Sequence, residues 1–373
     1  MKYYIIAGEA SGDLHGSNLM QALQHQDSNT SFRFWGGDLM AAYGGEPVKH
    51  IKDLAFMGFV EVVANLRTIL TNIKLCKSDL LKFQPNALIL IDYPGFNMRI
   101  AEFAKANGIP VHYYISPQVW AWKQNRVHKL KKTVDFMYCI LPFEKDFYKK
   151  FEMEVDYVGH PLVDAIQKFR SAASLETDFR KKYNLSERPI LALLPGSRLQ
   201  EIKKKLPLML GAANAFSDME IVIAAAPNIE AKVYLDIAKN IPIQIIPNQT
   251  YEVLNNAYAA MVTSGTATLE TALFHVPQVV CYKGNPISVA IARRLVKIDY
   301  ISLVNLIMNK EVVKELIQSE LTEKNIIEHL GPLIETSKKR EILLTAYNEL
   351  EAILGGGGAS EKVAGLIFER TKQ

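Results

Sequence analysis

The sequence predicts two α/β domains, each built on a doubly wound parallel sheet, and a helical C-terminal tail. The chain has 373 residues, which is enough for two domains of ordinary size. Short apolar runs alternate with helical patterns along most of the chain, as is typical of repeated β-α units. Most of these runs are continuous rather than alternating, which indicates parallel strands covered on both faces.

The predicted strands form two series, and this places the domain boundary near residue 165. Between the series, the segment Lys168–Glu187 is polar and helical, with no buried strand. The domains are therefore assigned to residues 1–165 and 166–340. The strands are predicted at Lys2–Gly8, Ser31–Gly37, Asn86–Asp92, Val111–Ser116, Phe136–Pro142 and Asp156–Val158, then at Ile190–Pro195, Glu220–Ala226, Ile243–Pro247, Ala259–Ser264 and Gln278–Tyr282.

Helices are expected to dominate the end of the chain. Strand patterns stop near Ser302, and a glycine run at 355–358 breaks the chain before its last helix. We expect this tail, residues 341–373, to cross back to the first domain or to pack on another subunit of a homodimer. The late helices are predicted at Glu311–Ser319, Glu323–His329, Leu333–Leu354 and Ser360–Arg370.

Composition excludes several classes of protein. Lys and Arg number 43 against 39 Asp and Glu, and the net charge of +4 is too small to indicate a nucleic-acid-binding protein. The 3 cysteines lack a Cys-x-x-Cys spacing, which fits a reducing cytoplasm. No apolar stretch reaches about 18 residues, so no membrane-spanning helix is expected. Asp-x-Asp is absent, so we expect no metal ion at the site.

The turn after the first strand could contact a ligand. It contains Gly8, Glu9, Ser11 and Gly12, and such a turn brings backbone amides and a helix N-terminus together. It matches neither the Gly-x-Gly-x-x-Gly nor the P-loop pattern, so no dinucleotide or other cofactor is expected. The structural alternative is a tight turn capped by Asp13.

Two similar loops follow strands of the second domain. One contains Arg198, which could clamp a diphosphate through two hydrogen bonds or could instead form an interdomain salt bridge. The other begins at Ser264, Gly265 and Thr266 and offers small residues and a helix N-terminus. Glu270, which follows, could accept hydrogen bonds from a ribose or could only complement the helix dipole. Together the loops predict a nucleoside diphosphate site.

Asp92 is the candidate general base. It closes a buried strand and faces the expected ligand cleft between the domains. Helix capping is its structural alternative, but Asn97 lies closer to the helix start and could cap in its place. Glu9 and Asp13 are rivals on the neighbouring loop, and His15 and His160 are weaker candidates.

The segment 57–75 carries an apolar stripe at helical spacing, flanked by basic residues. One interpretation is a helix that packs on the domain core, and the other is a helix that lies in a membrane interface. A second basic segment lies between His112 and Phe151, with eight basic residues against three acidic ones and two tryptophans. It could bind lipid headgroups, or it could be an ordinary solvated helix face. The candidate membrane-docking residues are Phe59, Val60, Val63, Leu66, Ile69 and Leu70.

Several long motifs resemble those of the lipid-A-disaccharide synthases, bacterial inverting glycosyltransferases of the GT-B fold. The motifs run in order along almost the whole chain. One departure is Gly95, where the family pattern has a second acid, and this places more weight on Asp92. The matching stretches are Ala7–Asp13, Met57–Val62, Ile91–Asn97, Ser116–Trp122, Leu141–Lys145, Leu193–Arg198, Ser264–Ala267 with Glu270, and Arg294–Asn305.

The resemblance implies two facing Rossmann-like domains and a specific reaction. The donor would be UDP-2,3-diacylglucosamine, the acceptor 2,3-diacylglucosamine 1-phosphate, and the products the β-1,6-linked disaccharide 1-phosphate and UDP, without a metal. Asp92 would deprotonate the acceptor 6-hydroxyl, and Glu9, Ser11 and Gly12 would lie near the acceptor or sugar. Asn305 matches a position associated with activity. The enzyme would be cytoplasmic and peripheral on the phospholipid inner leaflet of the inner membrane.

The roles implied for the second domain concern UDP. Arg198 and the turn at Ser264, Gly265 and Thr266 would stabilise the leaving group, and Glu270 would bind the ribose. Two other functions stay open. A UDP-sugar epimerase would use the same architecture but needs no lipid acceptor, and a nucleotide-lipid carrier would bind both ligands without releasing UDP.

Overall fold

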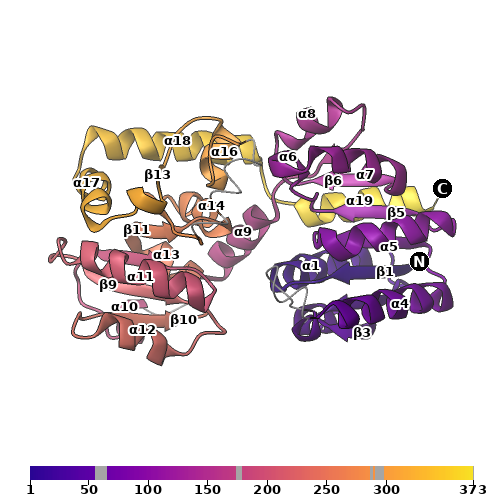
Figure 1. Cartoon of the computed structure of the whole chain (residues 1–373), viewed down its shortest axis with the longest axis horizontal. Helices are drawn as coiled ribbons and strands as arrows, with labels where there is room; N and C mark the ends of the chain where they lie inside the picture. The colour runs from indigo at the N-terminus through magenta and orange to yellow at the C-terminus, as the bar shows by residue number, and fades with distance from the viewer. Residues whose placement is uncertain (55–64, 174–178, 286–288, 290–297, 373) are drawn as a thin grey trace. The chain divides into compact units, whose positions relative to one another are not determined.

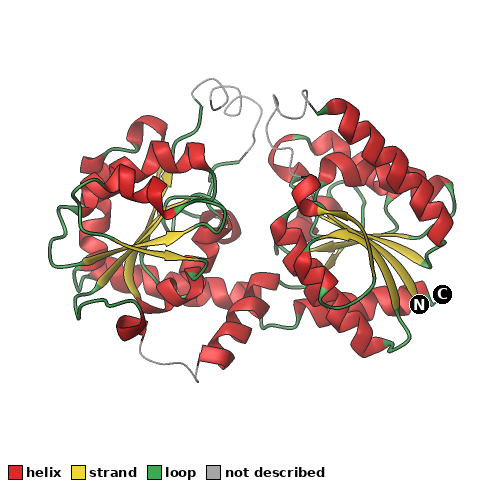
Figure 2. Ribbon diagram, turned by 90° about the horizontal axis from the view of Figure 1, so that it is seen from below, coloured by secondary structure: helices red, strands yellow, loops and turns green. Residues whose placement is uncertain are grey.

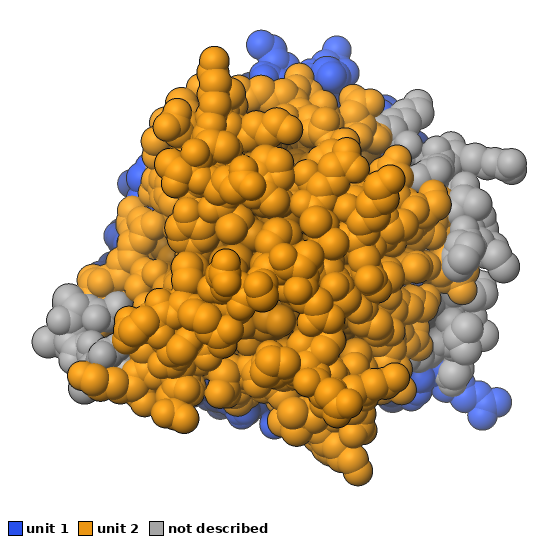
Figure 3. Space-filling view, turned by 90° about the vertical axis from the view of Figure 1, so that its left-hand side faces the viewer, with its two compact units in different colours: residues 1–164, 356–373 blue, residues 165–355 orange. Residues whose placement is uncertain are grey.

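The computed structural model describes residues 1–54, 65–173, 179–285, 289 and 298–372. The chain divides into two compact units, which are distinguished by colour in Figure 3. Unit 1 consists of residues 1–164 together with 356–373, and unit 2 consists of residues 165–355. Each unit holds one parallel sheet with helices on both faces (Figure 2).

The sheet of unit 1 has the strand order β3-β2-β1-β4-β5-β6-β7, and all its neighbouring strands pair in parallel (Figure 1). Its central strand β4 is buried at every residue, as expected for a strand between two helical layers. The elements are β1 (Lys2–Ala7), α1 (Ala10–Gln26), β2 (Ser31–Gly36), α2 (Asp38–Ala41), β3 (Glu46–His50), α4 (Leu66–Phe83), β4 (Ala87–Ile91), α5 (Pro94–Ala106), β5 (Val111–Tyr114), α6 (Val119–Trp122), α7 (Val127–Thr133), β6 (Phe136–Cys139), α8 (Glu144–Lys149), β7 (Asp156–Tyr157) and α19 (Ala359–Thr371), with α9 (Pro161–Ala173) leading into unit 2.

The sheet of unit 2 repeats this topology with the order β10-β9-β8-β11-β12-β13, again parallel throughout. The predicted fold class, two doubly wound α/β domains with C-terminal helices, is confirmed. The elements are α10 (Phe179–Lys182), β8 (Ile190–Leu194), α11 (Leu199–Ala213), β9 (Glu220–Ala225), α12 (Ala231–Ala238), β10 (Gln244–Pro247), α13 (Thr250–Asn256), β11 (Ala257–Thr263), α14 (Thr266–Leu273), β12 (Gln278–Tyr282), α16 (Leu303–Met308), β13 (Lys314–Ile317), α17 (Glu323–Ile334) and α18 (Lys338–Leu354).

Two edge strands were not predicted. The helix expected at Glu311–Ser319 is wrong, because residues 314–317 form β13 and pair with β12. Its Lys and Glu residues favour a helix, but pairing with β12 and burial of Leu316 decide the outcome. Strand β3 contains Pro47 and two charged residues, so it lacks the apolar run that marks a strand, and an edge position tolerates this composition.

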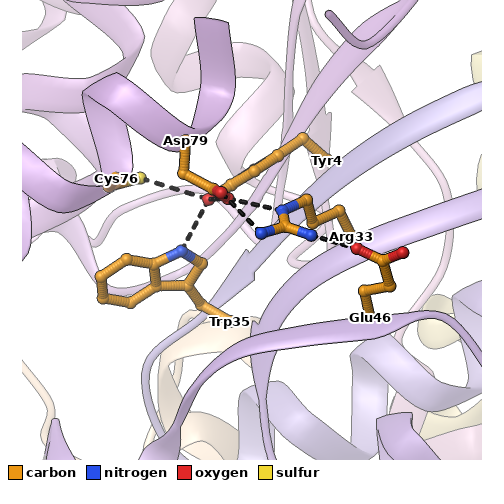
Figure 4. A network of polar contacts seen from close by, with 6 residues as sticks. All are labelled: Tyr4, Arg33, Trp35, Glu46, Cys76 and Asp79. Carbon is orange, nitrogen blue, oxygen red and sulfur yellow. Dashed lines mark hydrogen bonds and ion pairs between the residues drawn. The ribbon is translucent and has the colours of Figure 1, made fainter. Parts of the chain in front are cut away.

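A polar network fastens α4 to the first strands of unit 1 (Figure 4). Asp79 of α4 accepts hydrogen bonds from Arg33 Nε at 2.7 Å and Nη2 at 2.6 Å, and from the Tyr4 hydroxyl at 2.8 Å. Trp35 Nε1 donates to the same Tyr4 oxygen at 2.8 Å, and Glu46 forms an ion pair with Arg33 at the surface. The buried Asp79 carboxylate is therefore both ion-paired and hydrogen-bonded, which offsets the cost of removing its charge from water.

The last helix completes the core of unit 1 (Figure 1). Helix α19 packs along α1, and its Val363, Ala364 and Ile367 are buried among the residues of β1 and β4. Asp164 caps it by accepting hydrogen bonds from the backbone amides of residues 358, 359 and 360. The tail expected over 341–373 is thus divided, since α18 belongs to unit 2. A dimer formed by exchange of α19 would have to release these contacts.

Candidate active site

The candidate residues gather at the same topological position in both sheets. In each sheet the chain order reverses between two central strands, β1 and β4 in unit 1 and β8 and β11 in unit 2. Ligands of doubly wound sheets bind outside the carboxyl ends of the strands at such a switch point. In unit 1, Ala7 pairs with Ile91, so the turn that follows β1 adjoins Asp92. In unit 2, the loops after β8 and β11 are neighbours in the same way.

Asp92 is fixed by hydrogen bonds to its backbone. It and Tyr93 adopt left-handed conformations, with φ of 44° and 47°. The Asp92 carbonyl oxygen accepts hydrogen bonds from the Tyr113 hydroxyl at 2.6 Å and from Asn97 Nδ2 at 2.7 Å, and its amide donates to the Tyr114 carbonyl. The expectation that Asn97 caps the helix is therefore wrong, because its side chain donates to the end of β4.

The electrostatic surroundings suit Asp92 to proton transfer. Burial, and then the nearby negative charge of Glu9, raise the pKa of Asp92 to about 6, while the Tyr93 amide acts to lower it. A carboxylate with a pKa near 6 is a stronger base than an ordinary aspartate and is still ionised at pH 7. Such a perturbed group at a ligand-binding edge is a candidate for catalysis.

The turn after β1 brings its backbone close to Asp92. Glu9 is the N-cap residue of α1, and Ser11 is exposed in the first turn of that helix. A Cβ atom on Gly8 would lie 2.3 Å from the Tyr93 ring, and one on Gly12 would lie 3.2 Å from the Cβ of Ala7. These two glycines allow the turn to pack tightly on the strand ends.

Of the rival candidates, Asp13 has a structural role, and the two histidines are weak bases. The Asp13 carboxylate accepts hydrogen bonds from three backbone amides, of Gly37 at 2.7 Å and of residues 39 and 40 at 3.1 Å. It thus joins α1 to Gly37, which follows β2, and to α2. Burial lowers the pKa of His15 to about 4 and that of His160 to about 3, so both imidazoles are neutral at pH 7.

Unit 2 contains a cavity of about 250 Å³ at its switch point. It lies between the loops after β8 and β11, where the sequence predicted a diphosphate site. Ser264, Gly265, Thr266 and Glu270 line it, while Arg198 follows two lining residues in the chain and extends into solvent. The lining residues are Leu194, Gly196, Ser197, Glu201, Ala224, Ala226, Pro227, Thr250, Thr263, Ser264, Gly265, Thr266, Ala267 and Glu270.

The cavity offers both a helix N-terminus and a carboxylate. Gly265 is the N-cap residue of α14, and the space around its Cα is open. Glu270, the fifth residue of α14, accepts a hydrogen bond from the Tyr251 hydroxyl at 3.1 Å. Burial raises the pKa of Glu270, although Tyr251 acts to lower it. Tyr251, which orients this carboxylate, was not predicted, because nothing in the sequence distinguishes it from the many other aromatic residues of the chain.

Asn305 lies behind the cavity rather than in its wall. Its Oδ1 accepts hydrogen bonds from the amides of residues 312 and 313, and its Nδ2 donates to the Val313 carbonyl and to Glu315 Oε1. Glu315 in turn accepts from the amides of Ile301 and residue 302, and the Ile301 carbonyl accepts from the Ser264 hydroxyl at 2.9 Å. Asn305 is thereby connected to the cavity. Glu315 was missed, although a charged residue within an apolar run was a usable signal.

The candidate docking residues are only partly visible. Phe59, Val60 and Val63 lie outside the described residues. Helix α4 begins at Leu66, and its Leu66 and Leu70 are 49% and 47% exposed. Ile73, Cys76 and Leu80 on another face are buried, so α4 does pack on the core of unit 1. The interpretation that this helix packs on the domain core is confirmed for its buried face, and the membrane interpretation stays a prediction for the exposed face.

The described part of the chain shows neither a metal-binding cluster nor a membrane-spanning helix. Among these residues, no group of three or more His, Cys, Asp or Glu side chains is placed to hold a metal ion. Among the helices that the structure describes, none has the length and apolar character needed to cross a bilayer.

The fold is shared with an epimerase and a glycotransferase of known structure. A UDP-GlcNAc 2-epimerase from Neisseria meningitidis, solved with bound UDP-GlcNAc, matches with a TM-score of 0.70 at 15% identity, covering 99% of this chain and 100% of that one. A glycotransferase of kitacinnamycin matches with a TM-score of 0.66 at 12% identity, covering 99% of this chain and 98% of that one. At these identities the likeness shows the fold alone.

Sequence comparisons are more specific. A family model described as lipid-A-disaccharide synthetase matches residues 3–355. The lipid-A-disaccharide synthase of Trichlorobacter lovleyi is 36% identical, covering 99% of this chain and 97% of that protein. That of Syntrophus aciditrophicus is 39% identical, with the same shares of 99% and 97%. The match includes both switch-point loops, and the chain belongs to the lipid-A-disaccharide synthetase family of glycosyltransferases.

Proposed function

We propose that this protein transfers 2,3-diacylglucosamine from UDP to 2,3-diacylglucosamine 1-phosphate, forming the β-1,6-linked disaccharide 1-phosphate and UDP. The observation that carries the proposal is the family match over residues 3–355, which includes Asp92 and every lining residue of the unit 2 cavity. The two solved structures share the fold at 15% and 12% identity, so they favour no particular sugar chemistry.

The unit 2 cavity is the proposed UDP site. The backbone amides at the start of α14, near Ser264, Gly265 and Thr266, would donate hydrogen bonds to the diphosphate, whose negative charge favours a helix N-terminus. Arg198 would add a cation that balances the charge developing on the leaving UDP. Glu270, held by Tyr251, would accept hydrogen bonds from the ribose hydroxyls. Asn305 would act through Glu315 and Ile301 by keeping Ser264 in place.

Unit 1 is the proposed acceptor side. The Asp92 carboxylate would remove the proton from the acceptor 6-hydroxyl as the oxygen attacks the anomeric carbon, so that the configuration inverts. Glu9 would sustain the basicity of Asp92 through its charge. Ser11, which is exposed at the helix start, would donate a hydrogen bond to the acceptor, and Gly12 would keep the turn close to β1.

The decisive assay supplies both acylated sugars and follows UDP and disaccharide together. We expect the two products in equal amounts, and we expect turnover to continue in excess EDTA because charge on UDP is balanced by Arg198 and α14. A new sugar isomer formed from the UDP-sugar alone would instead identify an epimerase. Saturable binding of both substrates without UDP release would identify a carrier, and strict dependence on Mg²⁺ would contradict the metal-free step.

The exposed start of α4 is the proposed contact with the cytoplasmic face of the inner membrane. Leu66 and Leu70 present apolar surface next to Arg67 and Lys74, which suits an interface rich in anionic phospholipid. Such a peripheral position would bring the active site close to two acylated substrates that reside in the membrane. Trp122, which is 48% exposed with Lys123 Nζ 4.1 Å above its ring, offers a second amphipathic contact on unit 1.

Replacing both Leu66 and Leu70 with serine is expected to weaken binding to anionic phospholipid vesicles at least about tenfold, since each leucine gives up about 1.5–3 kcal/mol of burial when fully inserted. Sedimentation with vesicles measures this. Because both side chains are half exposed, the thermal unfolding temperature should stay near that of the parent protein. Leu81→Ser is the matched control, since Leu81 is 45% exposed near the other end of α4. Equal vesicle binding by all three proteins would contradict the assignment.

A further inference from the structure

Helix α11 buries a lysine side chain next to the loop that follows β8. The Lys205 side chain is 2% exposed, and its Nζ lies 3.6 Å from Glu201 Oε2, one helical turn earlier. Burial lowers the pKa of Lys205, while the Glu201 charge acts to raise it. Burying an ammonium group costs free energy unless the group is paired. Packing alone therefore does not explain a lysine at this position.

Glu201 is shared between two cations. Its Oε1 lies 3.4 Å from Arg198 Nη1, and its Oε2 faces Lys205. The two partners differ in exposure, because the Arg198 side chain is 62% exposed whereas Lys205 is enclosed. Glu201 therefore has one partner at the protein surface and one that is enclosed.

The pair lies against the loop that follows β8. Gly196 has a φ of 112°, and a Cβ atom at this position would lie 2.6 Å from Glu201 Oε2 and 3.5 Å from Lys205 Nζ. Gly196 and Glu201 both line the cavity, so a carboxylate forms part of the wall where a diphosphate is proposed to bind. The Glu201 carboxylate and a bound diphosphate would both be negative and would repel each other. The repulsion would grow as the ligand displaces water, because the local dielectric constant falls.

We propose that Lys205 is a positioning residue that acts as the permanent counter-ion of Glu201, so that Arg198 is released to bind the diphosphate when UDP enters. This inference rests on the proposed function of the cavity. Without Lys205, Glu201 would keep Arg198 as its counter-ion and would also repel the phosphates. With Lys205 in place, the Glu201 charge is balanced whether or not Arg198 turns away. Lys205 itself touches no substrate in this scheme.

Lys205→Met tests the inference, because methionine keeps an unbranched chain but removes the charge. We expect the Kd for UDP, measured by titration calorimetry, to rise about tenfold, with a larger effect on KM for the UDP-sugar than on kcat. Adding Glu201→Gln to the same chain should restore UDP affinity to within about threefold of the parent protein, since no carboxylate then competes for Arg198. Glu201→Gln alone should bind UDP at least as tightly as the parent.

The matched control is Lys204→Met, which makes the same change of net charge at an exposed neighbour on α11 and should leave the Kd unchanged. Equal affinity of Lys205→Met and the parent would overturn the inference, and so would equal weakness of Lys205→Met and the double variant. If Lys205→Met does not fold, weaker UDP binding by the folded Glu201→Gln variant would overturn it. A parent protein that binds no UDP would instead refute the proposed function of the cavity.

Discussion

Asp92→Asn is expected to reduce kcat at least about 10²-fold while making the protein more stable. Loss of a positioned general base typically costs about 10²–10⁴ in rate, because the acceptor hydroxyl must then ionise without assistance. The amide has nearly the shape of the carboxylate, so UDP affinity, which is proposed to depend on unit 2, should not change. Turnover assays and titration with UDP measure the two quantities on the same preparation.

The expected gain in stability follows from the raised pKa of Asp92. Burial and Glu9 favour the protonated form in the folded protein, so this group stabilises the fold below pH 4 and loses that contribution as pH rises through about 6. At pH 7.5 the buried ionised carboxylate opposes folding by on the order of 2 kcal/mol, and the neutral amide removes this cost. Asparagine also tolerates the left-handed φ of 44° at this position.

Calorimetric unfolding at two pH values separates these effects. Asp92→Asn should unfold at a higher temperature than the parent at pH 7.5, and the difference should shrink near pH 4, where Asp92 is protonated.

The companion variant Glu9→Gln removes the neighbouring negative charge, so the acidic limb of the kcat/KM profile should move to lower pH. Turnover of Asp92→Asn within tenfold of the parent, or an unmoved acidic limb in Glu9→Gln, would remove the base assignment.

Asp79→Ala is expected to destabilise unit 1 by about 3 kcal/mol, since it leaves Arg33 without its buried partner and removes the acceptor of the Tyr4 hydroxyl. Burial alone would raise the pKa of Asp79, but hydrogen bonds from Arg33 and Tyr4 outweigh it and hold the pKa below its usual range. The contribution is therefore present above about pH 4 and is lost as pH falls through the lowered pKa. Denaturant titration at pH 7 measures it.

Glu46→Ala is the control for this prediction because Glu46 pairs with the same arginine but is 72% exposed. An exposed ion pair contributes at most about 1 kcal/mol, so this variant should unfold close to the parent. Equal stabilities of the two variants would contradict the prediction, because the buried Asp79–Arg33 pair would then contribute no more than the exposed Glu46–Arg33 pair. Retained UDP affinity would show that unit 2 is undisturbed.

The strands that helices cover on both faces could be predicted from the sequence. Strands such as β4 and β8 are buried at every residue and appear in the sequence as unbroken apolar runs. Strands β3 and β13 lie at the sheet edges, where one neighbour and partial exposure relax the apolar pattern, so composition alone misleads. The doubly wound topology then follows from few elements, since crossovers between parallel strands have one hand.

The candidate site was predictable where residues follow strand ends. Asp92, Ser264 and Arg198 lie in loops that the topology brings to a switch point, so their places in the chain indicate their places in the fold. The partners of these residues were not predictable. Tyr251 reaches Glu270 across 19 positions of the chain, and Asn97 turned out to donate to β4 rather than to cap its own helix. Such choices depend on side-chain geometry that spacing does not carry.

Helix α19 has a consequence for synthesis on the ribosome. Chains emerge from their N-terminus, and domains generally fold as units in that order. Here, unit 1 combines residues 1–164 with residues 356–373, so it lacks the Val363, Ala364 and Ile367 side chains of its core until the ribosome has passed unit 2. Unit 2 is complete earlier. Unit 2, with the proposed UDP site, could therefore fold first, and unit 1 would complete its core only after α19 has emerged from the ribosome.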